Sequence, residues 1–206
     1  MNTRALRDYR DSLTLSAEQR GLLTGMLLGD AHLERRASGT VHLKVEHCVQ
    51  QNNYAMWKYH CFQQWVLTPP QRKLKRHKLG SVSENVWFNT IAHPQLCEWY
   101  AHFYQEGLKV IPENLALTPL ALAVWFMDDG SRKSRECRGL YLNVQCFSQA
   151  EVRKLQACLR QNFQISTTTR SQSDGLQIYI PSCETSHFTE IVECHLIASM
   201  RYKLSG

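Results

Sequence analysis

Two long, largely apolar segments that each lead to an acidic residue constrain this chain more than any other feature. The first runs from Leu22 to Leu28 and leads to Asp30. The second runs from Leu120 to Met127 and leads to Asp129, 99 residues further along (129 − 30). Segments that are apolar on most sides are typical of buried helices. A carboxylate at the end of a buried helix is costly unless a cation neutralises it, so both ends are candidate cation sites.

The residues that precede the two segments favour helices. Ser16 and Gln19 have the spacing of a capping box, in which each side chain bonds the backbone N–H of the other residue. Thr118 is a suitable N-cap residue, and Pro119 fits the first helical position, where a backbone N–H is not needed. We therefore predict one helix over residues 17–30 and a second from Pro119 to the following pair of acids.

The two halves of the chain match beyond these helices. Residues 42–47 and 141–146 both begin 12 residues after an acid, and both alternate apolar and polar side chains as half-buried strands do. A lysine follows late in each half, with Lys109 lying 79 residues after Asp30 and Lys203 lying 74 residues after Asp129. We interpret the chain as two diverged copies of one unit, residues 1–110 and 119–206, joined by a linker at 111–118.

The motif Trp125-Phe126-Met127-Asp128-Asp129-Gly130 resembles the second motif of the monomeric, two-motif LAGLIDADG homing endonucleases. The resemblance extends from about Leu15 to Leu204, because the Lys109-Val110-Ile111-Pro112 segment and the terminal Tyr202-Lys203-Leu204 also match in order and spacing. The first motif departs from the family name, with Thr24 in place of Ala and Leu28-Gly29 in place of an Asp-Ala pair. It retains Gly25 and Asp30.

The resemblance implies an α+β fold of two pseudo-symmetric αββαββα units. The acid-bearing LAGLIDADG helices are expected at the interface of the units, and each unit is expected to form a saddle-shaped antiparallel sheet that binds DNA. Gly25, Ala121 and Ala123 are small enough to let the two helices approach closely.

Periodicity and turn residues predict the remaining elements. In the first unit we expect a turn at 37–40, strands at 41–48 and 85–91, and helices at 52–65 and 94–105. In the second unit Ser148 and Glu151 form a capping box at a helix start, strands are expected at 140–147, 167–171 and 176–180, and the last helix covers 184–198. The basic run 72–78 could be a DNA-contacting segment, a targeting-like patch or a solvated loop.

Family resemblance also assigns the candidate chemistry. It implies that Asp30 and Asp129 are catalytic carboxylates that bind Mg²⁺, for which Mn²⁺ can substitute, and that Lys109 and Lys203 stabilise developing charge or organise the attacking water. Gly29 and Asp128, which precede the two acids, complete the candidate metal site. For Asp128 itself we favour a helix-end role in which it bonds backbone groups.

The alternation of the strands separates a helix-facing side from a polar side. Polar-side residues suited to base edges are His42, Lys44, Glu46, Tyr141, Asn143, Gln145, Gln177 and Tyr179. Candidate phosphate contacts are Arg35, Arg72, Lys73, Lys75, Arg76, Lys78, Arg132, Lys133 and Arg170. The alternative for each residue is a solvated sheet face without a ligand.

Composition agrees with a polyanion as partner. Lysine and arginine outnumber aspartate and glutamate by 24 to 18, which gives a net charge of +6. The first 20 residues lack the apolar region of a signal peptide, and no apolar run reaches the roughly 18 residues that span a bilayer. We expect a soluble intracellular protein without a membrane partner, located in the cytoplasm or in an organellar matrix or stroma.

Eight cysteines raise the alternatives of disulfides or zinc. No CxxC pair is present, and a reducing compartment disfavours disulfides, so we expect buried thiols. The sharpest zinc alternatives combine His47-Cys48 with His60-Cys61, or Cys183 with His187, and scattered pairs of this kind are usually structural.

These observations predict a monomeric homing endonuclease, intron-encoded, that cuts one phosphodiester on each strand of a long asymmetric double-stranded DNA site and leaves short 3′ overhangs. The alternative is a maturase that binds its own intron RNA and assists splicing. A third hypothesis is a transcription factor that binds DNA without cutting it.

Overall fold

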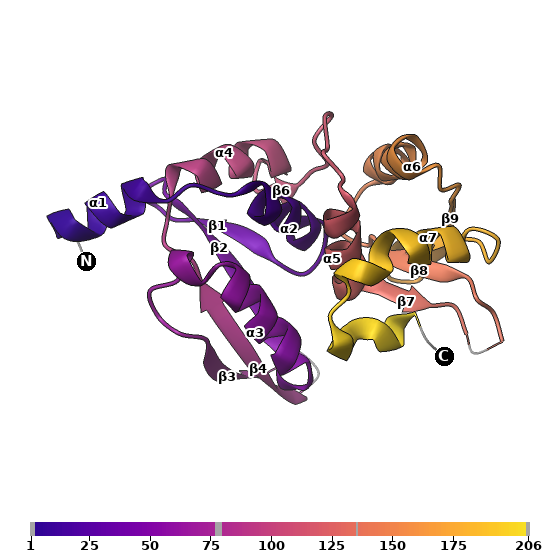
Figure 1. Ribbon diagram of the computed structural model, residues 1–206, viewed down its shortest axis with the longest axis horizontal. Coiled ribbons are helices and arrows are strands. Elements are labelled where there is room, and N and C mark those ends of the chain that lie inside the picture. Colours follow the sequence, from indigo (N-terminus) through magenta and orange to yellow (C-terminus); the bar gives the residue numbers. More distant parts are fainter. Residues whose placement is uncertain (1–2, 77–79, 135, 205–206) are drawn as a thin grey trace. The chain divides into compact units, whose positions relative to one another are not determined.

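A computed structural model describes residues 3–76, 80–134 and 136–204 of the chain (Figure 1). The chain forms two compact units, one made of Met1–Gln19 with Asp30–Ala101 and the other of Arg20–Gly29 with His102–Gly206. The boundary between them passes through helix α2 (Ala17–Leu28), so most of that helix belongs to the second unit. The division of the sequence repeat at residues 111–118 stays a prediction.

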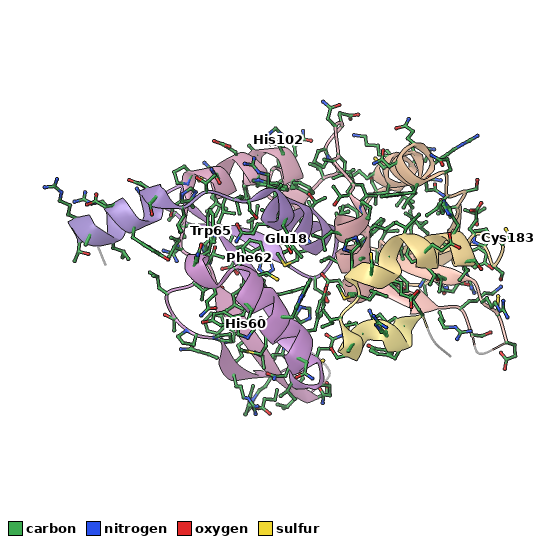
Figure 2. The ribbon with its side chains drawn as sticks, in the orientation of Figure 1. Glu18, His60, Phe62, Trp65, His102 and Cys183 are labelled. Atoms are coloured by element: carbon green, nitrogen blue, oxygen red, sulfur yellow. The ribbon has the colours of Figure 1, made fainter. Side chains whose placement is uncertain are left out.

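The first unit contains a four-stranded antiparallel sheet in the order β1-β2-β4-β3. Its elements are α1 (Arg4–Ser12), β1 (His32–Arg35), β2 (Val41–Cys48), η1 (Val49–Gln51), α3 (Asn52–Cys61), η2 (Gln63–Trp65), β3 (Gln71–Arg76), β4 (Val82–Asn89) and α4 (Pro94–Phe103). Helix α3 lies along one face of the sheet (Figure 1). The strands send Leu43, Val45 and Phe88 into the core, where Phe62 and Trp65 from the end of α3 and from η2 are also buried (Figure 2).

The second unit repeats this architecture with the sheet order β7-β8-β10-β9. Its elements are β5 (Tyr104–Gln105), β6 (Leu108–Lys109), α5 (Pro119–Asp129), β7 (Gly130–Arg132), β8 (Leu140–Asn143), α6 (Gln149–Phe163), β9 (Thr168–Gln172), β10 (Gly175–Ile180), α7 (Thr185–Val192), η3 (Glu193–His195) and η4 (Ala198–Lys203). Every residue of α5 from Ala121 to Met127 is fully buried. Phe126 of α5 meets Phe188 of α7 edge to face, with ring centroids 5.1 Å apart.

The predicted α+β class and the two αββαββα element orders are confirmed, and so are the caps that start the helices. Ser16 Oγ accepts from Gln19 N while Gln19 Oε1 accepts from Ser16 N, both at 3.1 Å. Thr118 Oγ1 accepts from Ala121 N at 3.1 Å, with Pro119 at the first helical position. Ser148 and Glu151 form the predicted capping box at α6.

Several predicted boundaries were wrong. The expected helix over 52–65 ends at Cys61, whose carbonyl accepts from Gln19 Nε2 at 2.9 Å, and a 3₁₀ turn follows. The expected helix over 17–30 ends at Leu28, and Gly29-Asp30 form a turn.

The predicted strands and the last helix also differ from the structure. The strand expected over 140–147 ends at Asn143, and the helix expected over 184–198 gives way to a 3₁₀ turn after Val192. The strand expected over 85–91 covers Val82–Asn89 instead. No residue ranges were predicted for the helix α1 or for the strands β1 and β7, and the two strands, with four and three residues, carry little periodic signal.

The basic run at 72–76 is also not a loop. It is the edge strand β3, paired antiparallel with β4 from Gln71↔Trp87 to Arg76↔Val82. Charged side chains, lysine above all, are a common way to protect an edge strand from pairing with another chain.

Candidate active site

Helices α2 and α5 of the second unit pack backbone against backbone. A Cβ atom added at Gly25 would lie 2.4 Å from the carbonyl oxygen of Ala121 and 2.6 Å from Cβ of Val124. At Gly29 it would lie 2.4 Å from Cβ of Asp128, whereas at Gly21 the nearest atom, Thr118 Oγ1, is 3.2 Å away. Glycines spaced four residues apart share one helix face, so this face fits α5 only because it has no side chains. The predicted close approach at Gly25 is therefore present, and the contact extends to Gly29.

The two predicted catalytic acids follow the ends of these helices. Asp129 is the last residue of α5 and is half-buried, and its carbonyl oxygen accepts from Asn143 Nδ2 at 2.9 Å. Asp30 follows α2 and begins the second segment of the first unit, with a side chain that is 45% exposed. Each carboxylate therefore keeps access to a ligand from solvent.

Both predicted catalytic lysines bond the ends of the acid-bearing helices. Lys109 Nζ donates to the carbonyl oxygen of Gly29 at 2.9 Å. Lys203 Nζ donates to the carbonyl oxygens of Met127 at 2.6 Å and Asp128 at 2.9 Å. The last carbonyls of a helix have no partner within it and carry partial negative charge, so an ammonium group is stabilised there. The same arrangement of acid and lysine thus occurs twice.

Asp128 is more deeply buried than the two candidate catalytic acids, Asp30 and Asp129. It is buried, with 8% of its surface exposed, and it packs against Gly29. Its carbonyl oxygen accepts from Lys203, and the predicted helix-end role of its side chain stays a prediction.

A buried network next to Asp30 was missed by sequence reasoning. His47 at the end of β2 was considered only for zinc, yet its Nδ1 lies 3.7 Å from Asp30 Oδ2. Its Nε2 lies 3.0 Å from Nζ of Lys58, a residue of α3 that is almost completely buried. The strand alternation contained a signal, because residue 47 falls on the same side as the core residues Leu43 and Val45.

The polar face of the first sheet has a network of charged side chains. Glu46 accepts from Lys73 Nζ and Asn85 Nδ2, both at 2.7 Å, and lies 3.7 Å from Lys75 Nζ. Burial alone would raise the pKa of Glu46, but the hydrogen bonds from Lys73 and Asn85 outweigh it and lower the pKa. Cross-strand partners share a face, so these charges stand side by side on the polar face.

A second group on this face surrounds Glu34, which sequence reasoning did not select. Its Oε1 lies 2.7 Å from Lys44 Nζ, and its Oε2 lies 3.2 Å from His42 Nε2. Burial would raise the pKa of Glu34, but hydrogen bonds from Lys44 and His32 lower it to about 2. His42, a predicted base contact, lies on this polar face, but its side chain is only 5% exposed.

The other predicted phosphate contacts of the first unit divide between the two faces. Arg72 pairs across the sheet with the core residue Val86, so Arg72 and Arg76 lie on the opposite face from Lys73 and Lys75. Arg35 ends β1 and is exposed, with its guanidinium 5.9 Å from the ring of Tyr100. Lys78 lies outside the described residues.

The polar face of the second sheet is dominated by amides and rings. Gln177 Nε2 donates to Asn143 Oδ1 at 2.7 Å, which connects this face to Asp129 through the bond from Asn143. Arg170 pairs across the sheet with Gln177, and its Nη1 donates to the hydroxyl of Tyr141. Tyr141 is buried, and Tyr179 packs against it with ring centroids 5.3 Å apart.

The remaining candidates of this unit lie at its margins. Gln145 is exposed beyond the end of β8 and donates weakly to Asn143 and Asp174, both at 3.4 Å. Lys133 Nζ lies 5.2 Å from the ring of Tyr179. Arg132 pairs with the core residue Leu140, so it lies on the helix-facing side of the sheet.

The expectation of buried cysteines was wrong. All eight cysteines are free thiols, three of them are exposed and five are half-buried. Cys183 lies in the exposed segment before α7 (Figure 2). Burial raises the pKa of Cys61 to about 11, whereas hydrogen bonding to Ser182 lowers the pKa of Cys137.

Comparison with known proteins places the chain in a family. Residues 20–188 match the model of the LAGLIDADG DNA endonuclease family, so the chain belongs to that family. It is 32% identical over 204 residues to the cytochrome b mRNA maturase bI2 of Saccharomyces cerevisiae, and the match covers 90% of this chain and 47% of that protein. The chain thus spans about half the length of that relative.

Two further relatives match nearly end to end. The DNA endonuclease I-ChuI of Chlamydomonas applanata is 26% identical, with 94% of this chain and 97% of that protein covered. The structure of the homing endonuclease I-WcaI bound to its DNA recognition sequence superimposes with a TM-score of 0.92 and 27% identity, covering 98% of this chain and 93% of that one. Among the described residues, no helix is both long and apolar enough to cross a membrane.

Proposed function

We propose that this protein is a site-specific homing endonuclease that cuts one phosphodiester on each strand of a double-stranded DNA target and leaves short 3′ overhangs. The observation that carries the proposal is the twofold occurrence of an acid and a lysine at a buried helix end. Asp30 follows Gly29, which Lys109 bonds, and Asp129 follows Asp128, which Lys203 bonds. One such helix end for each strand would account for two cuts. Family membership and the DNA-bound I-WcaI structure support this assignment.

The donor groups at these helix ends fit a divalent cation. Asp30 and Asp129 offer carboxylate oxygens that solvent reaches. Oxygen donors of this kind suit Mg²⁺ or Mn²⁺. A bound cation would neutralise phosphate charge and lower the pKa of a coordinated water. Lys109 and Lys203 hold positive charge at the same helix ends, where charge develops as the phosphodiester is attacked.

The two sheets would provide the recognition surface. In the first sheet Lys44, Glu46, Lys73 and Lys75 share the polar face, and in the second sheet Asn143, Gln177 and Arg170 do so. Side chains of these types bond base edges in the major groove or phosphate oxygens. Because the two sets differ, a monomer with these two faces would recognise an asymmetric target.

The test uses purified full-length chain and a randomised double-stranded DNA library with Mg²⁺. We expect selection of one long target with short 3′ overhangs. Asp30→Asn and Asp129→Asn should each abolish double-strand cleavage but leave binding of the selected target within a few-fold of the wild type. Lys154→Met, on α6 and ion-paired with Glu113, serves as the control and should cut normally. Full cleavage by either Asn variant would remove the acids from the mechanism.

The relationship to a maturase supports a second candidate function. The yeast protein that is 32% identical to this chain carries the name of an mRNA maturase. If this chain also assists splicing, adding it to the intron transcript that encodes it should accelerate splicing, and Asp30→Asn should do so equally well. No acceleration with the cognate transcript would exclude this function. Either function could be performed in the cytoplasm or in an organelle.

A further inference from the structure

Helix α1 contributes no side chain to the core of the first unit. It projects from the rest of that unit (Figure 1), and none of its nine residues is buried. The helix is nonetheless held at a defined place. Tyr9 Oη donates to the carbonyl oxygen of Gln64 at 2.7 Å. His93 Nε2 donates to the carbonyl oxygen of Arg10 at 3.1 Å. A surface helix that is fixed but buries none of its side chains is free to make an intermolecular contact.

A cavity of about 550 Å³ lies between α1 and the adjacent end of the first sheet. Arg7 and Arg10 of α1 line it together with Arg36, which follows β1, and its described lining residues include no aspartate or glutamate. Arg10 forms an ion pair with Asp11 at 2.6 Å. Arg7 and Arg36 are exposed, and neither forms an ion pair with another residue that the structure describes. The cavity therefore has two positive charges that an anion could neutralise.

The cavity continues the polar face of the first sheet. Trp87 and Asn89 of β4 are among the residues that line it. In the antiparallel pairing with β2, Trp87 lies opposite Glu46 and Asn89 lies opposite Lys44. Cross-strand partners share a face, so both lining residues are on the side that carries the proposed recognition residues. DNA that follows this face past the end of the sheet would reach the arginines.

The cavity is remote from the candidate catalytic acid that follows α2. Arg36 comes directly after β1, whose last residue pairs with Val41 at the start of β2. The residue of β2 that lies near Asp30 is His47, six residues further along the strand (47 − 41). At a rise of about 3.3 Å per residue this separation is roughly 20 Å. A phosphate bound at the cavity would thus not be the phosphate that is cut.

We propose that α1 and this cavity form a further DNA-binding site, which contacts backbone phosphates of the duplex beyond the base pairs that the first sheet reads. The proposal rests on the proposed function. Guanidinium groups bind phosphate oxygens through charge-assisted hydrogen bonds, and such contacts carry no sequence information of their own.

The second half of the chain has no counterpart of α1. At the 99-residue offset of the repeat, residues 4–12 correspond to residues 103–111, which contain the hairpin of β5 and β6. The additional contact should therefore extend the bound DNA at one end of the target and not at the other.

The charge contribution can be measured without a known target. The full-length chain is titrated into a random-sequence DNA duplex at several salt concentrations in the absence of divalent cations. The slope of log K against log salt falls in magnitude by about 0.9 for each phosphate contact that is lost, so Arg7→Gln/Arg36→Gln should lower it by about 1.8. An unchanged slope would overturn the proposal.

The matched control removes the same net charge elsewhere. Arg153 and Arg160 are exposed on α6, which packs against β10 on the helix-covered side of the second sheet. Arg153→Gln/Arg160→Gln should leave the salt slope as in the wild type. An equal fall in both double variants would show a general effect of net charge and would also overturn the proposal.

The location of the contact is tested on the selected target. A duplex that holds this target alone is compared with duplexes extended by one helical turn at either end. We expect extension at one end to tighten binding of the wild type several-fold, and Arg7→Gln/Arg36→Gln to lose that gain. At saturating protein the variant should cut at the wild-type rate, which also shows that it is folded.

Equal gains for the wild type and the variant would overturn the proposal. So would a loss of affinity confined to the intron transcript, since the arginines would then bind RNA. If no target can be selected, the proposed nuclease function fails, while the salt slopes on random-sequence duplex still decide whether Arg7 and Arg36 contact DNA.

Discussion

The backbone contact between α2 and α5 makes Gly25→Ala a sharp test of the structure. The added Cβ would lie 2.6 Å from Cβ of Val124, about 1 Å short of the roughly 3.5–4.0 Å at which carbon atoms attract. It would also lie 2.4 Å from the carbonyl oxygen of Ala121. Neither atom can rotate away, because one belongs to the backbone and the position of a Cβ atom is set by the backbone that carries it.

The expected free-energy change combines two opposing effects. Overpacking of a well-packed interior costs about 1–3 kcal/mol, and a clash with backbone belongs at the upper end. Alanine recovers about 1 kcal/mol relative to glycine through its helix propensity. We therefore expect a net loss of about 2 kcal/mol, and at ~2–4 °C per kcal/mol for a chain of this size the Tm should fall by about 4–8 °C. Thermal unfolding followed by far-UV circular dichroism measures this shift.

Gly21→Ala is the matched control on the same face of the same helix. It gains the same propensity, but its Cβ would meet side-chain atoms alone, with Thr118 Oγ1 at 3.2 Å and Leu120 Cδ2 at 3.6 Å. We expect its Tm to stay within about 2 °C of the wild type or to rise. If Gly25→Ala were as stable as Gly21→Ala, the two helices could not pack backbone to backbone as described.

Three further predictions concern charge and thiols. Burial would raise the pKa of Glu34, but Lys44 and His32 lower it from 4.5 to about 2, so the contribution of Glu34 to stability is complete above about pH 4.5 and is lost as the pH falls toward 2. In the Glu34→Gln variant the urea midpoint should therefore fall less steeply across this pH window. An unchanged dependence of the midpoint on pH would contradict the ion pairs. Lys203→Met removes a charged donor from two carbonyls at the end of α5 and should cost about 1–3 kcal/mol in urea unfolding, whereas a neutral effect would mean that the lysine is not held there. With limiting iodoacetamide at pH 8, Cys137 should be alkylated before Cys61, because hydrogen bonding lowers the pKa of the Cys137 thiol and burial raises the pKa of the Cys61 thiol to about 11. Peptide mass spectrometry measures the order, and earlier alkylation of Cys61 would contradict the prediction.

The sequence predicted the parts of the fold that depend on local chemistry. The capping residues Ser16, Thr118 and Ser148 start helices where expected, because a cap needs only the side chain and the backbone three residues away. The two acids, their lysines and the order of the elements followed from the repeat and from the family resemblance.

The features that could not be predicted depend on distant partners. At the end of α3 the side chain of Gln19, 42 residues away, donates to the carbonyl of Cys61. Lys58 looks like a solvent-facing helix residue until β2 brings His47 beside it. The burial of His42 depends on β1, a strand of four residues that has too few alternations to be recognised.

The membership of α2 in the second compact unit has a consequence for how the gene could be divided. A cut in the linker at 111–118 would give two polypeptides, and the C-terminal one would expose the apolar face of α5 that Gly21, Gly25 and Gly29 normally cover. Neither polypeptide would then have a complete interior without the other. A protein of this design lends itself to conversion into a two-component tool, whose parts are inert when produced separately and which assembles only in cells that express both.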